Sequence, residues 1–334
     1  MSKGLVSVIT PCYNTGHILS RLFDSLLSQT YPDIEVIAVN DGSTDDTSEV
    51  IESYVQRFQE KGYRLVNLYQ ENQGMAVAIN NAMKLIKGEY LVWPDSDDYY
   101  AADDAIEKMV ASLATASSEF AVVRTLRRVV DEVTMEEMYV SGGSSKPQED
   151  RSLFDDCLFI RNGFYFCAGA YMVRTDALRE MTSMDIYTHK DAGQNWQILL
   201  PLLWKYRCLT IKEVLYNVVA RKDSHSRDCL GYERKLARVE VYELTLLNTL
   251  DRIKTMPDSQ IKEYKFQVGL KYLKERLELA YSYRKRADFI VWYRNLAKKQ
   301  KTGLTSLMRL RYFAVKVHAE RLLDFFISIK HRII

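Results

Sequence analysis

The chain has 334 residues and a mass of 38.8 kDa, and its 46 basic and 44 acidic side chains give a formal net charge of +2. With 47% apolar and 27% charged residues it can bury a substantial core, which excludes a disordered tail or a solenoid of polar repeats. The near-zero net charge argues against a nucleic-acid binder that relies on a global basic surface. We therefore expect a globular protein without a nucleic-acid partner.

Signals for export and membrane insertion are weak. The longest stretch without Asp, Glu, Lys or Arg runs from Gly4 to Ser20 and contains Pro11, Asn14 and His17, whereas a membrane span needs about 20 mostly apolar residues. The N-terminus carries no pattern of a secretory signal. The five cysteines are odd in number, widely spaced and without a Cys-x-x-Cys pair, so neither a disulfide framework nor a zinc site is expected. The expected location is the reducing cytoplasm.

The first 120 residues alternate short apolar runs with longer amphipathic ones. The apolar runs predict strands at 6–9, 34–39, 64–68, 90–92 and 120–123. Apolar residues at three-to-four spacing predict helices between them, at 18–27, 47–58, 76–86 and 105–113. This alternation predicts an α/β fold with a mostly parallel, doubly wound sheet, in which ligands bind at the carboxyl ends of the strands.

The pattern changes twice further along the chain. Residues 125–151 mix charges with a Gly- and Ser-rich run, which we interpret as a flexible excursion or lid. A second α+β stretch follows to about residue 219, and the periodicity is nearly all helical after Tyr232. We therefore divide the chain into 1–124, 125–230 and a helical region 231–334. Residues 298–334 carry nine basic and two acidic residues, so the remainder has a net charge of about −5.

Acidic and amide side chains follow the predicted strands. The strands end in Thr-Pro-Cys-Tyr-Asn (10–14), in Asn-Asp-Gly-Ser-Thr-Asp-Asp-Thr (40–47) and in Trp-Pro-Asp-Ser-Asp-Asp (93–98). Asp95 and Asp97 are two residues apart on an extended turn, and such paired oxygen ligands suit Mg²⁺ or Mn²⁺ holding a diphosphate. An EF-hand is excluded, because Tyr100 and Ile106 stand where that loop needs Gly and Glu.

These strand ends, together with Asn72-Gln73-Gly74 and Gly88-Glu89-Tyr90, resemble those of a family 2 glycosyltransferase with the GT-A fold, as found in bacterial surface-glycan synthesis. The resemblance is dense over residues 4–120 and loose over the next hundred. It implies a metal-dependent, inverting transfer of a sugar from a UDP-linked donor to a hydroxyl of a glycan or lipid-linked glycan. The residues implied to hold the nucleotide sugar are Pro11, Tyr13, Asn14, Asp41, Asn72, Gly74, Asp95 and Ser96, with Asp41 on uracil and Asp97 on the metal.

Several of these residues have structural alternatives. Asp, Ser and Thr before a helical pattern also cap helices, and we favour capping for Asp45 and Asp46 but nucleotide binding for Asp41, which lies too early for a cap. Gly74 serves either close backbone approach or a tight turn. The 95–98 cluster alone would also suit a solvated turn.

The general base for an inverting transfer is not evident. The resemblance places Gln194-Asn195 where the family usually has Glu-Asp, and an amide cannot act as a base near neutral pH. Asp191 is the candidate base, or alternatively the N-cap of the following helix, while Asn195 can position a substrate. Trp196 is a sugar-stacking or a core residue. The amide pair also motivates the alternative of a non-catalytic sugar-nucleotide or glycan binder.

Two late segments carry further expectations. Arg221 is expected to neutralise phosphate, and His225 either completes the metal shell or is a solvated loop histidine. Near the end, apolar residues recur at three, four or seven positions among basic ones, which predicts a basic amphipathic helix. The apolar residues are Leu304, Leu307, Met308, Val315, Leu322, Phe325, Phe326, Ile329 and Ile333, and the basic ones are Arg309, Lys316, Lys330 and Arg332. That helix either lies peripherally on the inner face of an anionic membrane or packs on protein, including a second copy.

Overall fold

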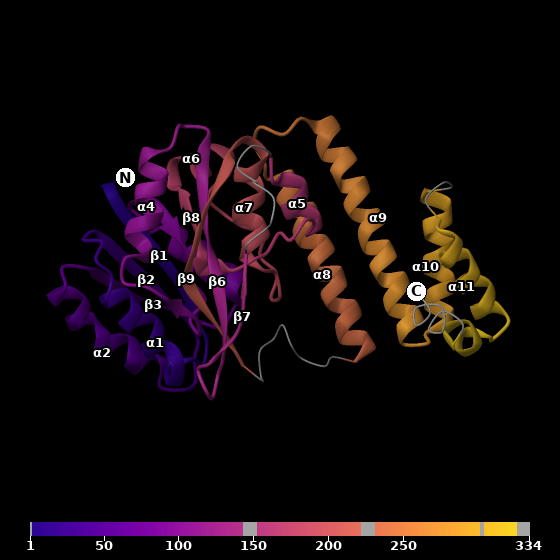
Figure 1. Ribbon diagram of the computed structural model, residues 1–334, viewed down its shortest axis with the longest axis horizontal. Coiled ribbons are helices and arrows are strands. Elements are labelled where there is room, and N and C mark those ends of the chain that lie inside the picture. Colours follow the sequence, from indigo (N-terminus) through magenta and orange to yellow (C-terminus); the bar gives the residue numbers. More distant parts are fainter. Residues whose placement is uncertain (1, 143–151, 222–230, 301–303, 326–334) are drawn as a thin grey trace. The chain divides into compact units, whose positions relative to one another are not determined.

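The structure is a computed structural model that describes residues 2–142, 152–221, 231–300 and 304–325 (Figure 1). The chain divides into two compact units. Met1–Asp228 and Thr245–Asp258 form what we call the sheet unit, and Cys229–Leu244 and Ser259–Ile334 form the helical unit. The first division lies close to the expected boundary after residue 230.

The first half of the sheet unit alternates strands and helices as the sequence predicts. The elements are β1 (Ser2–Cys12), α1 (Gly16–Leu27), β2 (Ile34–Asp41), α2 (Thr47–Glu60), β3 (Arg64–Gln70), α3 (Met75–Met83) and β4 (Gly88–Val92). β1 pairs in parallel with both β2 and β4, and β2 pairs in parallel with β3. The carboxyl ends of β2, β1 and β4 therefore lie in that order along one edge of the sheet.

The second half of the sheet unit makes the sheet mixed. It contains β5 (Tyr99–Tyr100), α4 (Ala105–Thr115), β6 (Phe120–Asp131), β7 (Glu137–Ser141), α5 (Phe154–Phe159), β8 (Tyr171–Arg174), α6 (Thr175–Met181), α7 (Gln194–Lys205) and β9 (Arg207–Ala220). The strand order is β3-β2-β1-β4-β8-β6-β9-β5, with β7 on β6. β8 is antiparallel to both β4 and β6. The expected α/β sheet is thus confirmed, with an antiparallel element in its second half.

The flexible excursion expected over residues 125–151 is wrong for the part that the structure describes. β6 continues to Asp131 and forms a hairpin with β7, in which Arg128 faces Val140 and forms an ion pair with Glu137 at 2.9 Å. The mixed charges there are cross-strand partners, which is why the sequence lacks an apolar strand signature. Residues 143–151 lie outside the described residues.

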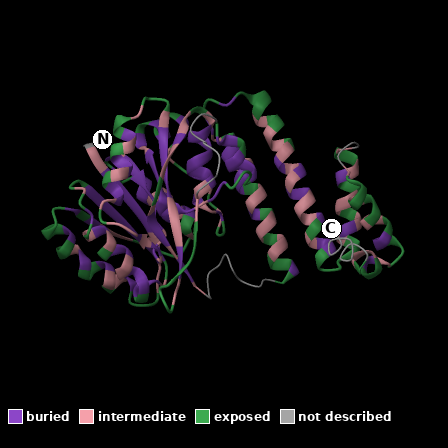
Figure 2. Cartoon of the chain, viewed as in Figure 1, coloured by how far each residue is buried: buried purple, intermediate pink, exposed green. Residues whose placement is uncertain are grey.

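The core follows the strands. Every residue of β2 is buried, and Val6, Val8 and Ile9 of β1 have no exposed surface, so apolar runs rather than alternation mark these central parallel strands (Figure 2). Four cysteines, Cys12, Cys157, Cys167 and Cys208, are buried free thiols. Cys229 lies outside the described residues. None of the helices in the described segments is long and apolar enough to cross a membrane.

The helical unit contains the first part of α8 (Tyr232–Asp251), α9 (Asp258–Ser282), α10 (Arg286–Lys299) and α11 (Ser306–Lys316). Its buried core joins Leu273 and Leu277 of α9, Phe289 and Leu296 of α10, and Val315 of α11. The continuous C-terminal helix predicted from the sequence is wrong. α11 ends at Lys316, residues 317–319 form a turn, and a new helical segment covers residues 320–325.

The apolar residues expected on that C-terminal helix divide between two environments. Leu304 and Met308 pack on the helical core beside Val315, whereas Leu307, Leu322 and Phe325 are exposed. Packing on the same chain therefore accounts for only part of the stripe. Phe326, Ile329, Lys330, Arg332 and Ile333 lie outside the described residues.

Candidate active site

Asp41, the last residue of β2, is an anchor for the loop that follows β3. It is only 4% exposed, and its Oδ1 accepts hydrogen bonds from Gln70 Nε2 (2.7 Å) and the Gln73 amide (2.9 Å). Its Oδ2 accepts a hydrogen bond from the Gly74 amide at 2.9 Å. A carboxylate oxygen accepts more than one hydrogen bond, so Oδ2 retains capacity for a ligand N–H. Sequence patterns alone do not predict this structural role of the Asp41 side chain.

Two glycines allow these loops to meet. Gly42 has a φ of +70°, and a Cβ there would stand 2.6 Å from the Asn72 amide nitrogen. Gly74 has a φ of +89°, and a Cβ there would stand 3.0 Å from the Lys190 carbonyl oxygen. Both φ values lie in the region that favours glycine, and both backbones approach a neighbour closely. Gly74, the N-cap residue of α3, therefore shows the close backbone approach, which is one of the two alternatives that the sequence left open.

The loop after β1 is fastened to the loop after β2. Asn14, with a φ of +52°, donates its backbone N–H to Ser43 Oγ at 3.0 Å and accepts from the Thr44 amide through its Oδ1 at 2.8 Å. Its side chain therefore holds the two loops together in this structure. Tyr13, beside it, is 49% exposed and free to meet a planar ligand. Pro11 pairs with Val39 of β2 and lies one residue from the strand end.

Asp45 and Asp46 were both expected to cap α2, and only Asp45 does so. Asp45 accepts hydrogen bonds from the amides of Thr47 (3.0 Å) and Gly16 (3.1 Å), the first residues of α2 and α1. Burial disfavours its charge, but these hydrogen bonds outweigh it and lower the pKa of the Asp45 carboxyl. Asp46 occupies the N-cap position of α2 without a side-chain hydrogen bond to the helix.

Three carboxylates lie at the carboxyl end of β4. Asp95 and Asp97 are partly exposed, whereas Ser96 and Asp98 are buried. Asp98 Oδ1 accepts a hydrogen bond from the Val219 amide of β9 at 2.9 Å. Arg221, one residue beyond β9, places its Nε 3.4 Å from Asp97 Oδ2. The end of β9 thus contacts residues 95–98, which we call the acidic turn.

The acidic turn carries negative charge that is poorly compensated. Burial, and then the charge of Asp97, raise the pKa of the Asp95 carboxyl to about 7. Burial and the charges of Asp97 and Asp95 raise the pKa of Asp98 well above its ordinary value. A bound cation would relieve this repulsion, so the donor set fits a hard divalent metal. Among the residues that the structure describes, no group of three or more His, Cys, Asp or Glu side chains is arranged to hold a metal by itself.

The amide pair at the start of α7 lies beside the acidic turn. Gln194 Nε2 donates to Asp95 Oδ1 at 3.2 Å, and the indole N–H of the fully buried Trp93 donates to Asn195 Oδ1 at 2.9 Å. Because an indole N–H can only donate, it fixes the orientation of the Asn195 amide and leaves the Nδ2 of Asn195 to donate to a ligand. Residues 194 and 195 therefore lie beside the turn that follows β4.

Asp191 precedes this helix rather than belonging to it. α7 begins at Gln194, and its N-cap is Gly193, which makes no side-chain cap, so the N-cap alternative for Asp191 is wrong. Asp191 is exposed on a turn, and the Lys190 backbone next to it lies against Gly74. Further back, Asn80 of α3 exchanges two hydrogen bonds with the Ile186 backbone, of 2.9 and 2.8 Å. The segment that carries Asp191 is therefore fastened to α3, which directly follows the loop anchored by Asp41.

Two further predicted residues, Asn72 and Trp196, lie in different environments. Asn72 is exposed on the loop anchored by Asp41. Trp196 is 8% exposed and donates to the Cys157 carbonyl oxygen at 2.9 Å, so it is a core residue. His225 lies outside the described residues. The sequence analysis assigned no individual role to Gln70, Trp93 or Asp98, because their roles depend on partners 29 to 121 positions away.

The loop held by Asp41, the turn at residues 95–98 and the start of α7 thus meet at the carboxyl edge of a mixed sheet, which is the arrangement of a GT-A transferase. The model of the family described as Glycosyl transferase family 2 matches residues 7–182. The chain belongs to this family, and the fold class expected from the sequence is confirmed.

Glycosyltransferase GlyA of Streptococcus pneumoniae is 34% identical over 117 residues, which are 35% of this chain and 16% of that protein. The matched stretches cover less than half the length of the first curated relatives. Residues 1–349 of TarS from S. aureus share the fold with a TM-score of 0.61 at 16% identity, over 97% of this chain and 91% of that one. A mannosyltransferase from Pyrobaculum calidifontis, in complex with GDP-Man and Mn²⁺, gives a TM-score of 0.54 at 16% identity, over 97% and 88%.

Proposed function

We propose that this chain is a metal-dependent, inverting glycosyltransferase that moves a sugar from a UDP-linked donor to a hydroxyl of a glycan or lipid-linked glycan. The observation that carries the proposal is the cluster of Asp95, Asp97 and Asp98 facing Arg221 and Gln194 at the carboxyl edge of the sheet. Carboxylates with raised pKa values beside an arginine suit a diphosphate held through a divalent cation.

The donor class is supported by two structural neighbours. TarS has been crystallised with UDP-GlcNAc, and the Pyrobaculum mannosyltransferase with GDP-Man and Mn²⁺. In this chain Asp97 and Asp95 would hold Mn²⁺ or Mg²⁺, together with phosphate oxygens, as is usual for such ions. When bound, the cation stabilises the charge that develops on the departing nucleoside diphosphate. Arg221 would share this role at the phosphates, and His225 is proposed as a further ligand.

The nucleoside would lie on the β1–β2 side of the site. Tyr13 presents an exposed ring, Asp41 retains an acceptor site for a uracil N–H, and Asn72 with Gly74 offers a backbone edge held by Asp41. Pro11, Asn14 and Ser96 would complete the binding surface for the base and ribose. A uridine donor is proposed because a carboxylate acceptor matches the N–H of uracil.

The acceptor side rests on Asp191 and Asn195. Asp191 is the proposed general base, since it is the exposed carboxylate nearest in sequence to the start of α7. Asn195, oriented by Trp93, would position a substrate hydroxyl or the donor sugar through its Nδ2. The alternative function, a sugar-nucleotide or glycan binder without transfer activity, is favoured by one observation: amides occupy positions 194 and 195, where a base is expected.

A nucleotide-sugar panel tests the proposal. We expect UDP-sugars to raise the melting temperature in Mn²⁺ but not in EDTA, because a ligand that binds only the native state stabilises it. GDP-mannose serves as the matched control for the base. If no UDP-sugar changes the melting temperature with Mn²⁺, the donor assignment fails. If UDP-sugars bind but are never cleaved or transferred, the binder alternative holds.

The proposed location is the cytoplasmic face of a membrane, with the helical unit as the contact. Leu307, Leu310 and Phe313 are 41–62% exposed and recur every three positions, which places them on one face of α11, and the exposed Val317 follows at the end of that helix. The net positive charge of residues 298–334 is complementary to anionic lipid.

Sedimentation with anionic vesicles at low salt tests this location. Phe313→Gln should weaken vesicle binding, whereas Phe266→Gln, which changes a similarly exposed ring on α9, should not. Dimerisation that is lost in the same Phe313 variant, without vesicle binding, would show instead that the stripe joins two copies.

A further inference from the structure

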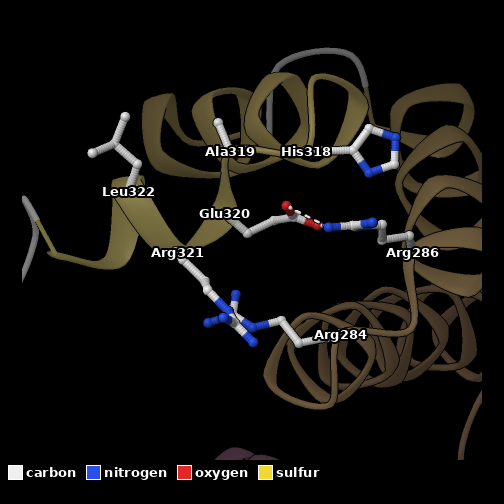
Figure 3. A pocket seen from close by; sticks show the side chains of 7 residues that line it. All are labelled: Arg284, Arg286, His318, Ala319, Glu320, Arg321 and Leu322. Atoms are coloured by element: carbon white, nitrogen blue, oxygen red, sulfur yellow. Dashed lines mark hydrogen bonds and ion pairs between the residues drawn. The ribbon is translucent and has the colours of Figure 1, made fainter.

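A cationic pocket lies within the helical unit, apart from the elements of the proposed transfer site. It has a volume of about 610 Å³, within the range of small-molecule sites. Its lining residues come from the α9–α10 turn, the start of α10 and the segment after α11 (Figure 3). They are Arg284, Arg286, His318, Ala319, Glu320, Arg321 and Leu322.

The charges in this pocket do not balance. Arg286 forms a two-pronged ion pair with Glu320, whose side chain is 4% exposed, and Arg284 pairs with Asp324. These two pairs use both carboxylates. In residues 304–325 and the other described segments, no hydrogen bond or ion pair engages Arg321. The guanidinium of Arg321 and the imidazole of His318 therefore remain available to an anion.

The pocket side chains converge. Figure 3 shows Arg284 and Arg321 extending toward one another, while Glu320 is turned to Arg286 on the other side. Two guanidinium groups directed toward each other repel unless an anion or solvent lies between them. Arginine forks match the geometry of phosphate oxygens, to which they donate paired, charge-assisted hydrogen bonds.

The backbone supports the same interpretation. Arg284 (φ +57°) and His318 (φ +60°) both follow helix ends, where the left-handed conformation usually selects glycine. The turns close through hydrogen bonds of 2.8 Å from Lys285 N to Ala280 O and from Ala319 N to Ala314 O. An arginine and a histidine accept this strained conformation in the two turns that line the pocket. Neither side chain is required for the turn itself.

We propose that this pocket binds a phosphate group, with Arg321 as its main donor, with Arg284, which is paired with Asp324, beside it, and with Arg286 and His318 at its rim. The phosphate belongs either to a small soluble phosphate compound or to a phosphorylated lipid headgroup. The proposal does not depend on the transfer activity, because every residue in it belongs to the helical unit.

Inorganic phosphate added to the full chain is the first probe, with sodium chloride at matched ionic strength as reference. We expect phosphate to raise the melting temperature of the wild type and of Arg309→Gln, a matched change of an exposed arginine on α11 that does not line the pocket. Arg321→Gln should weaken phosphate binding tenfold or more while melting normally without phosphate. Arg321→Glu should abolish binding and, by pairing with Arg284, should not lower stability in phosphate-free buffer.

The proposed transfer site would also bind phosphate through Arg221, so a variant of that site serves as a second control. If Arg221→Gln removes the phosphate effect and Arg321→Gln keeps it, the proposal is overturned. An unchanged melting temperature of the wild type up to high phosphate concentration overturns it as well.

Vesicles distinguish the two sources of phosphate. If phosphatidic acid vesicles bind more weakly to Arg321→Gln than to Arg309→Gln, and inorganic phosphate competes, the ligand is a headgroup. If inorganic phosphate binds and vesicle binding is equal in the two variants, the ligand is soluble.

Discussion

The carboxylate of Asp41 has a structural role and a proposed role in nucleotide binding. Substitutions at this position measure the structural role. The carboxylate is proposed to meet the nucleotide base, and it holds the amides of Gln73 and Gly74. We predict that Asp41→Ala lowers the free energy of unfolding by about 2–4 kcal/mol, because it leaves buried hydrogen-bond donors without a partner. Asp41→Asn keeps one acceptor oxygen and should lose less. Urea unfolding measures both, and equal stability of Asp41→Ala and wild type would contradict the anchoring role.

Asp95 makes stability depend on pH in the metal-free protein. Its folded-state pKa of about 7 lies above the ordinary value of 3.8, so its contribution to stability is full below about pH 4 and is lost as the pH rises through about 7. We predict that Asp95→Asn reduces the fall in melting temperature between pH 5 and pH 8. Asp191→Asn, which changes an exposed aspartate, should keep the wild-type fall. An identical pH profile for Asp95→Asn and wild type would argue against the raised pKa.

At the scale of elements, the start of α7 decides how the acceptor is deprotonated. If Asp191 is the base, Asp191→Asn should lower transfer by about a hundredfold or more, the usual contribution of general-base catalysis. Its exposure means that the fold should tolerate the change. Asn195→Asp keeps an oxygen for the Trp93 indole N–H and should not increase transfer.

Two other outcomes of that comparison are informative. Transfer that is unchanged in both variants would assign the proton to another group or to the acceptor itself. Activity that appears only in Asn195→Asp would indicate that the native chain is a binder.

The strands and helices differ in how well the sequence predicts them. The first four strands and the helices between them were predictable, because central parallel strands are apolar runs and the helices carry a three-to-four period. β7 and the charged part of β6 were not, since Arg128 and Glu137 are satisfied across a hairpin. The break at 317–319 contains neither Gly nor Pro, so the sequence gives no stop signal there.

The candidate site also contains residues that the sequence predicts and contacts that it does not. Asp95 and Asp97 could be predicted because two carboxylates follow a strand at short spacing. The hydrogen bond between Trp93 and Asn195 joins residues 102 positions apart, and the contact of Asp98 with Val219 joins residues 121 apart. Only the folded sheet brings such pairs into contact, so local patterns cannot reveal them.

For the molecule as a whole, we propose that the sheet unit cleaves a nucleotide sugar with the help of a metal held at its acidic turn. The family match covers residues 7–182, which contain the second half of β1, the elements from α1 to α6 and the acidic turn, while α7, β9 and the helical unit lie beyond it. The claim therefore rests on this chain's own contacts at Gln194, Asn195 and Arg221 as well as on its family.

The most direct test is UDP release from UDP-sugars with Mn²⁺, compared between wild type, Asp97→Asn and Asp103→Asn, an exposed aspartate six positions further on. We predict release by the wild type that EDTA abolishes, and an unchanged rate for Asp103→Asn. Asp97→Asn should be slower by about a hundredfold or more, because loss of the metal removes several kcal/mol of leaving-group stabilisation. A normal Mn²⁺-dependent rate in Asp97→Asn, or no release by the wild type from any UDP-sugar, would contradict the claim.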